Sequence, residues 1–195
     1  MRLWLQLSRY VTSIVLVFSC GCAAMERLQS SGALYLDDGK PRLNLLAVRQ
    51  AGTTDCGVAC LSGVLSYWGF SVSQDKIKSD LGHPPKGGYT LANLRDYALR
   101  HDFSAFVLQG SYDILQQQCS LGRPCIIVIK KDRKTNHSIV VVELSSSGDD
   151  RRLLAMDPAD GRLKSFPASE INSRWEAKGY PLLLIGRKGE TDDQM

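Results

Sequence analysis

The chain has 195 residues, of which 44% are hydrophobic and 23% are charged, and its formal net charge is +4. This length suits a single domain, and the composition excludes a disordered, collagen-like or coiled-coil chain. The small net charge comes without any long run of Lys and Arg, so nothing indicates a nucleic-acid partner.

Residues 1–24 have the three-part pattern of a signal peptide: a positive start, the apolar run 11–18, and small residues around Cys20 and Cys22. The apolar run is far shorter than the roughly 20 residues that a membrane-spanning helix needs. The segment 17–20 resembles the bacterial lipoprotein signal, in which a Cys is acylated. We therefore expect a periplasmic protein that is lipid-anchored to a membrane through Cys20. Cys22 is the rival acceptor, and ordinary signal cleavage is the alternative.

The mature chain divides into three parts. Residues 25–42 are expected to hold a polar tether and an N-terminal hairpin, with strands over 33–36 and 43–48 around an Asp-Gly turn. One folded domain is expected over 43–186, and residues 187–195 are expected to form a disordered polar tail.

The order of the predicted elements indicates the fold class. Apolar residues at helical spacing predict helices over 55–68, 73–81, 91–101 and 111–119. Runs rich in β-branched residues then predict strands over 125–130, 138–144 and 152–156, followed by a helix over 165–175 and a last strand over 180–185. Helices before strands, without alternation, favour an α+β domain in which N-terminal helices pack on a C-terminal antiparallel sheet.

The most informative segment contains Cys56 at the first turn of a predicted helix. At that position the helix dipole and the unpaired backbone N–H groups favour a thiolate. Gly57 leaves space beside the sulfur for a substrate backbone. Gln50, six residues earlier, can direct its amide at the oxygen of an attacked carbonyl, together with the backbone N–H of Cys56. We expect Cys56 to be a nucleophile and Gln50 to belong to an oxyanion hole.

A thiolate needs a basic partner, and the chain has three histidines. His83 lies in a loop rich in Pro and Gly, and His101 ends a polar helix, so both are expected at the surface. His137 begins a valine-rich strand, which is a rigid position for a general base. Asp157 ends the next strand and would orient the imidazole if the two strands pair antiparallel. Asp160 is the alternative acid, but its position beyond the strand end favours Asp157.

Nucleophile, histidine and acid follow one another in the chain order of papain-like enzymes, and the surrounding segments resemble the peptidase C39 family. Its members include papain-like domains fused to bacteriocin-exporting ABC transporters. The resemblance covers Leu43 to Ile185 and rests on Arg49-Gln50, Asp55-Cys56-Gly57 with Ala59-Cys60, Tyr67-Trp68-Gly69, Gly122-Arg123-Pro124, His137, Asp157-Pro158 with Gly161, and Trp175. It implies a papain-like fold and a polypeptide substrate. It also implies that Cys56, His137, Asp157 and Gln50 are the catalytic residues.

Two features differ from the transporter-linked members: the sequence contains no Walker A motif or membrane domain, and it begins with an export signal. Free-standing exported C39-like proteins resemble the peptidase component of functional-amyloid (Fap-type) secretion systems. We therefore expect an endopeptidase that cleaves a secreted or periplasmic polypeptide, with secretion-system components as partners. Two other functions stay open: a non-catalytic module that binds an export substrate, and a cell-wall peptide amidase.

The remaining cysteines indicate structure rather than chemistry. Cys60 lies one helical turn after Cys56 and is expected to pack in the core. Cys119 and Cys125 flank a five-residue segment and are candidates for a disulfide in an oxidising compartment. The cysteines lack the paired spacing of a zinc site, so we expect no metal and no other cofactor.

Overall fold

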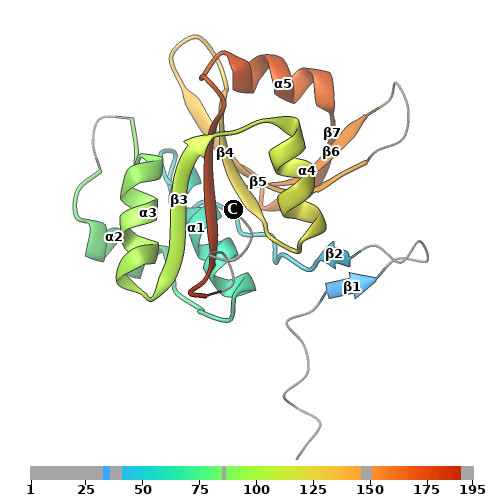
Figure 1. Cartoon of the computed structure of the whole chain (residues 1–195). Helices are drawn as coiled ribbons and strands as arrows, with labels where there is room; N and C mark the ends of the chain where they lie inside the picture. Colours follow the sequence, from blue (N-terminus) through green and yellow to red (C-terminus); the bar gives the residue numbers. More distant parts are fainter. Residues whose placement is uncertain (1–32, 36–40, 85–86, 146–150, 190–195) are drawn as a thin grey trace, which may run out of the picture. The chain divides into compact units, whose positions relative to one another are not determined.

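The computed structural model describes residues 33–35, 41–84, 87–145 and 151–189 (Figure 1). The predicted signal peptide with Cys20 and Cys22, most of the tether, the hairpin turn and the end of the tail lie outside the described residues. Within these ranges, no helix is both long and apolar enough to cross a bilayer.

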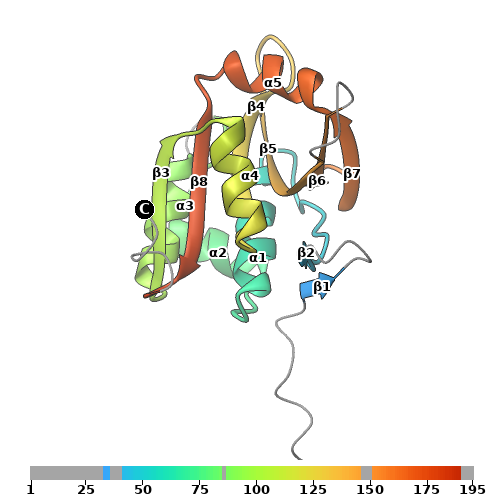
Figure 2. The ribbon, with the colours of Figure 1, turned by 45° about the vertical axis from the view of Figure 1, so that its right-hand side comes forward.

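A six-stranded sheet forms the centre of the domain, with the strand order β3-β8-β4-β5-β6-β7 and antiparallel pairing throughout. Its strands are β3 (Phe103–Gln109), β4 (Cys125–Lys130), β5 (Asn136–Leu144), β6 (Arg152–Asp157), β7 (Arg162–Pro167) and β8 (Pro181–Arg187). Strand β8 is last in the chain, yet it pairs between β3 and β4 (Figure 2). The end of the chain is thereby built into the middle of the sheet.

Helices cover both faces of this sheet. They are α1 (Cys56–Tyr67), α2 (Gln74–Leu81), α3 (Leu91–Arg100), α4 (Tyr112–Ser120) and α5 (Ala168–Glu176). In β4, Ile126 packs with helices α1 to α3, whereas Cys125 and Ile127 pack with α4 and α5 on the opposite face. Burial on both faces explains why β4 and β5 are nearly continuous apolar runs without polar alternation.

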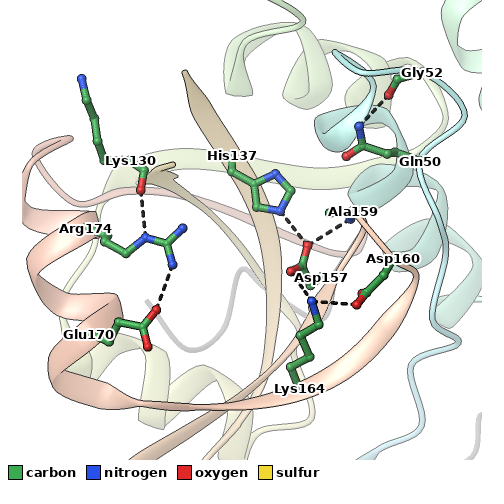
Figure 3. A network of polar contacts seen from close by, with 10 residues as sticks. All are labelled: Gln50, Gly52, Lys130, His137, Asp157, Ala159, Asp160, Lys164, Glu170 and Arg174. Atoms are coloured by element: carbon green, nitrogen blue, oxygen red, sulfur yellow. Dashed lines mark hydrogen bonds and ion pairs between the residues drawn. The ribbon is translucent and has the colours of Figure 1, made fainter. Parts of the chain in front are cut away.

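The predicted α+β class is therefore confirmed, with one refinement: the helices are divided between the two faces. Helix α5 is fastened to the sheet by Arg174, which donates to the carbonyl oxygen of Lys130 at 2.9 Å (Figure 3).

Helix α1 is the centre of the larger core. Residues 57–65 of this helix are all buried, because apolar or small residues occur on every side of it. At Gly63, an added Cβ would lie 3.5 Å from a methyl of Val48 and 3.6 Å from the carbonyl oxygen of Leu46. The small residue lets the segment that leads to Gln50 run close along the helix.

Most predicted elements, including the helix expected over 165–175, are found within three residues of their expected ends, but strands β3 and β7 were missed and the N-terminal hairpin differs. Strand β3 was not predicted; it follows α3 directly, through Asp102 at a φ of 61°, and pairs with β8 along its whole length. The expected helix 165–175 is a strand up to Pro167 and a helix only from Ala168, because residues 162–167 pair with β6.

The N-terminal hairpin also differs from the expectation. Its strands are β1 (Ala33–Tyr35) and β2 (Pro41–Leu43), with Ala33 opposite Leu43. Residues 44–48, expected as the rest of the second strand, are not a strand. They lie instead beside α1, where Leu45 is buried and the backbone N–H of Val48 contacts the sulfur of Met156 at 3.1 Å.

Candidate active site

Cys56 is the first residue of α1 and is partly exposed, whereas the residues that follow it in the helix are buried. The residue therefore lies at the positive end of the helix dipole. Gly57 has a packing role: an added Cβ would lie 3.2 Å from Leu94 and 3.7 Å from the carbonyl oxygen of Tyr89. The glycine lets α3 and the preceding loop pack closely against the start of α1.

His137 and Asp157 meet as the sequence led us to expect. The strands β5 and β6 pair antiparallel, and His137 Nε2 lies 2.7 Å from Asp157 Oδ1 (Figure 3). A carboxylate can only accept, so Nε2 carries the hydrogen and Nδ1 is the nitrogen left for Cys56. Cys56 and His137 are close enough that each shifts the pKa of the other. Three residues from three elements thus form one continuous series.

Two opposing effects determine the pKa of the Cys56 thiol. Burial raises it, but hydrogen bonds from His137 and Ser138 and the charge of His137 outweigh burial, so the pKa lies below its ordinary value. For His137 the two effects act in the reverse directions. Burial lowers its pKa, but hydrogen bonds and charge from Cys56 and Asp157 raise the pKa above its ordinary value. The shifts have opposite directions and favour the thiolate–imidazolium pair.

In the described part of the chain, Asp157 has two further hydrogen-bond partners besides His137. Its Oδ2 accepts from Lys164 Nζ at 2.8 Å, and its Oδ1 also accepts from the backbone N–H of Ala159 at 3.0 Å. Burial opposes ionisation, but bonds from Lys164, His137 and Ala159 lower the pKa of Asp157 to about 2. The carboxylate is therefore charged at every pH at which the protein would work.

Lys164 was not anticipated from the sequence. Its Nζ also lies 2.8 Å from Asp160 Oδ2. Asp160 therefore pairs with the lysine, and Asp157 is the acid that binds His137. Antiparallel pairing of residues 162–167 with β6 would have pointed to Lys164, since it is opposite Ala155, two residues before Asp157. The expected helix over 165–175 concealed that signal.

Gln50 lies on a loop beside Asp157. Its backbone N–H donates to the carbonyl oxygen of Pro158 at 2.8 Å, and its amide Nε2 donates to the carbonyl oxygen of Gly52 at 2.6 Å (Figure 3). Gly161 has a φ of +69°, and an added Cβ there would lie 2.8 Å from the backbone nitrogen of Arg49. The turn after β6 therefore packs directly on the Gln50 loop. The bond to Gly52 uses one of the two amide hydrogens of Gln50, and the second amide hydrogen is not part of that bond.

The other histidines are not part of this arrangement. His83 is exposed, and the ring of His101 lies against Tyr97 and Phe70, with centroids 4.5 Å and 5.0 Å away. In the ranges that the structure describes, no three or more His, Cys, Asp or Glu side chains are grouped so that they could hold a metal ion.

Among the described residues, Cys60, Cys119 and Cys125 are also free thiols. Cys60 is fully buried in the core, as expected. Cys119 and Cys125 are also buried, and their thiols donate to the carbonyl oxygens of Val141 at 3.9 Å and Arg123 at 3.7 Å, respectively; the nearby Cys119 raises the pKa of Cys125. They are close neighbours, and the disulfide between them stays a prediction.

Comparison with known proteins identifies the family. The model of the peptidase C39 family matches residues 45–188. The peptidase domain of Streptococcus ComA, a bi-functional ABC transporter in a quorum-sensing pathway, aligns with a TM-score of 0.60 and 21% identity, over 73% of this chain and 98% of that one. A double glycine motif protease from an AMS/PCAT transporter, solved with its leader peptide, aligns with a TM-score of 0.59 and 22% identity, over 74% and 92%.

A C39-like peptidase from Bacillus anthracis aligns with a TM-score of 0.57 and 18% identity, over 74% of this chain and 95% of that one. A search of curated proteins finds no significant match. At these identities the solved structures establish the shared fold, and the family match covers most of the chain. The chain therefore belongs to the peptidase C39 family.

Proposed function

We propose that this protein is a cysteine endopeptidase in which Cys56 is the nucleophile. The observation that carries this proposal is the 2.7 Å hydrogen bond between His137 and Asp157, together with Cys56, a partly exposed residue at the start of a buried helix, whose thiol pKa is lowered by His137. A non-catalytic binding module requires no such arrangement. A thiol that only fills space in a core requires no ionised histidine partner.

The reaction begins when the Cys56 thiolate attacks the carbonyl carbon of a peptide bond. The negative charge that develops on the oxygen is stabilised by the backbone N–H of Cys56 and by the second amide hydrogen of Gln50. The His137 imidazolium donates its proton to the leaving amine, and a thioester remains on the sulfur. His137 then removes a proton from water, which hydrolyses the thioester and releases the new carboxyl group and the thiolate.

Asp157 positions the histidine and stabilises its charged form throughout the cycle. It stays ionised because Lys164 and the backbone N–H of Ala159 bind it in addition to His137. The proton remains on the histidine rather than passing to the acid, since the pKa of Asp157 is about 2.

The proposed substrate is a polypeptide that is exported from the cell. The solved structure of a double glycine motif protease with its leader peptide supports a polypeptide substrate for this fold. Residues 1–24 support export of this chain, with lipidation at Cys20 and with Cys22 as the rival acceptor, so that the enzyme acts at a periplasmic membrane surface within a secretion system. Labelling of cells with a radioactive fatty acid tests this, since Cys20→Ala should abolish incorporation and Cys22→Ala should not.

Alkylation of Cys56 tests the proposed function without a known substrate. The full chain and the His137→Ala variant are treated with iodoacetamide over a range of pH, and the Cys56 peptide is quantified by mass spectrometry. The wild type should react well below the pH at which a free thiol ionises, near 8.5, and the variant should lose this reactivity. Equal titration near that pH in both proteins would instead favour a binding module.

A further inference from the structure

Gln74, the first residue of α2, binds the loop that carries Gln50. The backbone N–H of Ala51 donates to Gln74 Oε1 at 3.0 Å, and Gln74 Nε2 donates to the carbonyl oxygen of Arg49 at 2.8 Å. The two backbone groups belong to the residues on either side of Gln50. One amide side chain therefore grips both flanks of the proposed oxyanion-hole residue.

The chemistry of the two partners determines which way the Gln74 amide faces. A backbone N–H needs an acceptor and a carbonyl oxygen needs a donor, so only one orientation of the amide satisfies both. The amide makes the two bonds that a neighbouring β-strand would make with this segment. Residues 49–51 are themselves in neither a helix nor a strand.

A third bond holds the same segment from another side. The backbone N–H of Gln50 donates to the carbonyl oxygen of Pro158, just after Asp157. The Gln50 backbone is thus fixed between the turn after β6 and the start of α2. Helix α2 is a firm support, because the Ser73 side chain caps it and Ile77 is fully buried in the core.

We propose that Gln74 is a positioning residue that keeps the Gln50 amide directed at the attacked carbonyl. This inference rests on the proposed cysteine-peptidase function. Oxyanion-hole donors accelerate a reaction only when they are held in place before charge develops, so their support matters as much as their presence. Gln74 itself touches neither substrate nor sulfur in this role.

Two reactions of Cys56 separate this role from a purely structural one. Alkylation by iodoacetamide needs the thiolate but forms no oxyanion. Acylation by p-nitrophenyl acetate passes through an oxyanion: the sulfur forms a thioester with the acetyl group, and p-nitrophenolate leaves. Both rates are measured in the full chain, in a single turnover, on the Cys56 peptide by mass spectrometry.

In Gln74→Met and Gln74→Ala, we expect acylation to slow by about 10- to 100-fold, while the rate and pH dependence of alkylation stay as in the wild type. Gln50→Ala should behave in the same way, and the double variant with Gln74→Met should be no slower than Gln50→Ala alone. Lys76→Met is the matched control, since it breaks an exposed pair with Asp80 on the same helix. It should leave both rates unchanged.

Other outcomes would overturn the inference in distinguishable ways. Wild-type acylation in Gln74→Met would reject the role of Gln74 and leave the proposed function intact. An equal loss of alkylation and acylation would mean that Gln74 supports the fold around Cys56 and does not position the oxyanion hole. Acylation of the wild type no faster than that of the denatured chain would reject the peptidase function and the role of Gln74 together.

Discussion

Lys164 and His137 bind opposite oxygens of one carboxylate. The lysine Nζ lies 2.8 Å from Asp157 Oδ2, and the histidine Nε2 lies 2.7 Å from Oδ1. The lysine comes from β7, one of the two edge strands of the sheet, so this strand supports His137 indirectly. This contact connects the stability of the sheet edge to the chemistry of the proposed site.

Replacement of Lys164 by Met should make stability less dependent on pH. In the wild type the pKa of Asp157 is lowered to about 2, so its contribution to stability is present above the unfolded value, about 3.9, and is lost as pH falls through the folded value. Lys164→Met should reduce the free energy of unfolding near pH 6 by up to about 1 kcal/mol, because the lysine is partly exposed to solvent. Below pH 2 the two proteins should be equally stable. Urea unfolding across this range measures the difference, and Lys164→Arg should resemble the wild type.

Asp157→Asn should remove the negative charge that stabilises the protonated His137, while the fold persists. The neutral amide no longer stabilises the imidazolium, so the pKa of His137 should fall and that of the Cys56 thiol should rise. Acylation of Cys56 should slow by about 10²- to 10⁴-fold. Asp160→Asn is the matched control, since Asp160 binds the same lysine but not the histidine. If the two substitutions slowed acylation equally, the orienting role would not belong to Asp157 alone, which would contradict the prediction.

Gly161→Ala should disturb the Gln50 loop from outside the site. The added Cβ would lie 2.8 Å from backbone and side-chain atoms of Arg49, at a φ of +69°. Gly179→Ala shares the backbone penalty, at a φ of +76°, but its Cβ would meet no atom within 4 Å. Each variant should lose about 1–3 kcal/mol of stability from backbone strain, and only Gly161→Ala should also slow acylation of Cys56. Comparison of the two isolates the effect of loop displacement.

Cys119 and Cys125 should form a disulfide when the folded protein meets a disulfide oxidant. Both thiols are buried, Cys119 is near enough to raise the pKa of Cys125, and the closed loop would be short. The bond should add about 2 kcal/mol to the free energy of unfolding. Peptide mapping without reductant should show the linked pair with the loss of two hydrogens. Cys119→Ser should remove both the link and the gain in stability. Persistence of two free thiols after oxidation would contradict the prediction.

The local elements were largely predictable because they depend on local patterns. Helix α1 follows from apolar residues at helical spacing that end near Gly69, and β4 begins and ends where its β-branched run does. Strand β7 could not be recognised in the same way. Its residues become a strand because they pair with β6, and such pairing depends on a partner elsewhere in the chain.

The site shows the same division. The sequence by itself determined the family, the fold class and the order of Cys56, His137 and Asp157 along the chain, since these rest on residue types and spacing. Only the tertiary structure decided that Lys164 binds Asp157 and that Gln74 binds the backbone of Arg49, 25 residues away and next to Gln50. Such contacts depend on how separate surfaces meet when the chain packs. No pattern within either segment encodes that meeting.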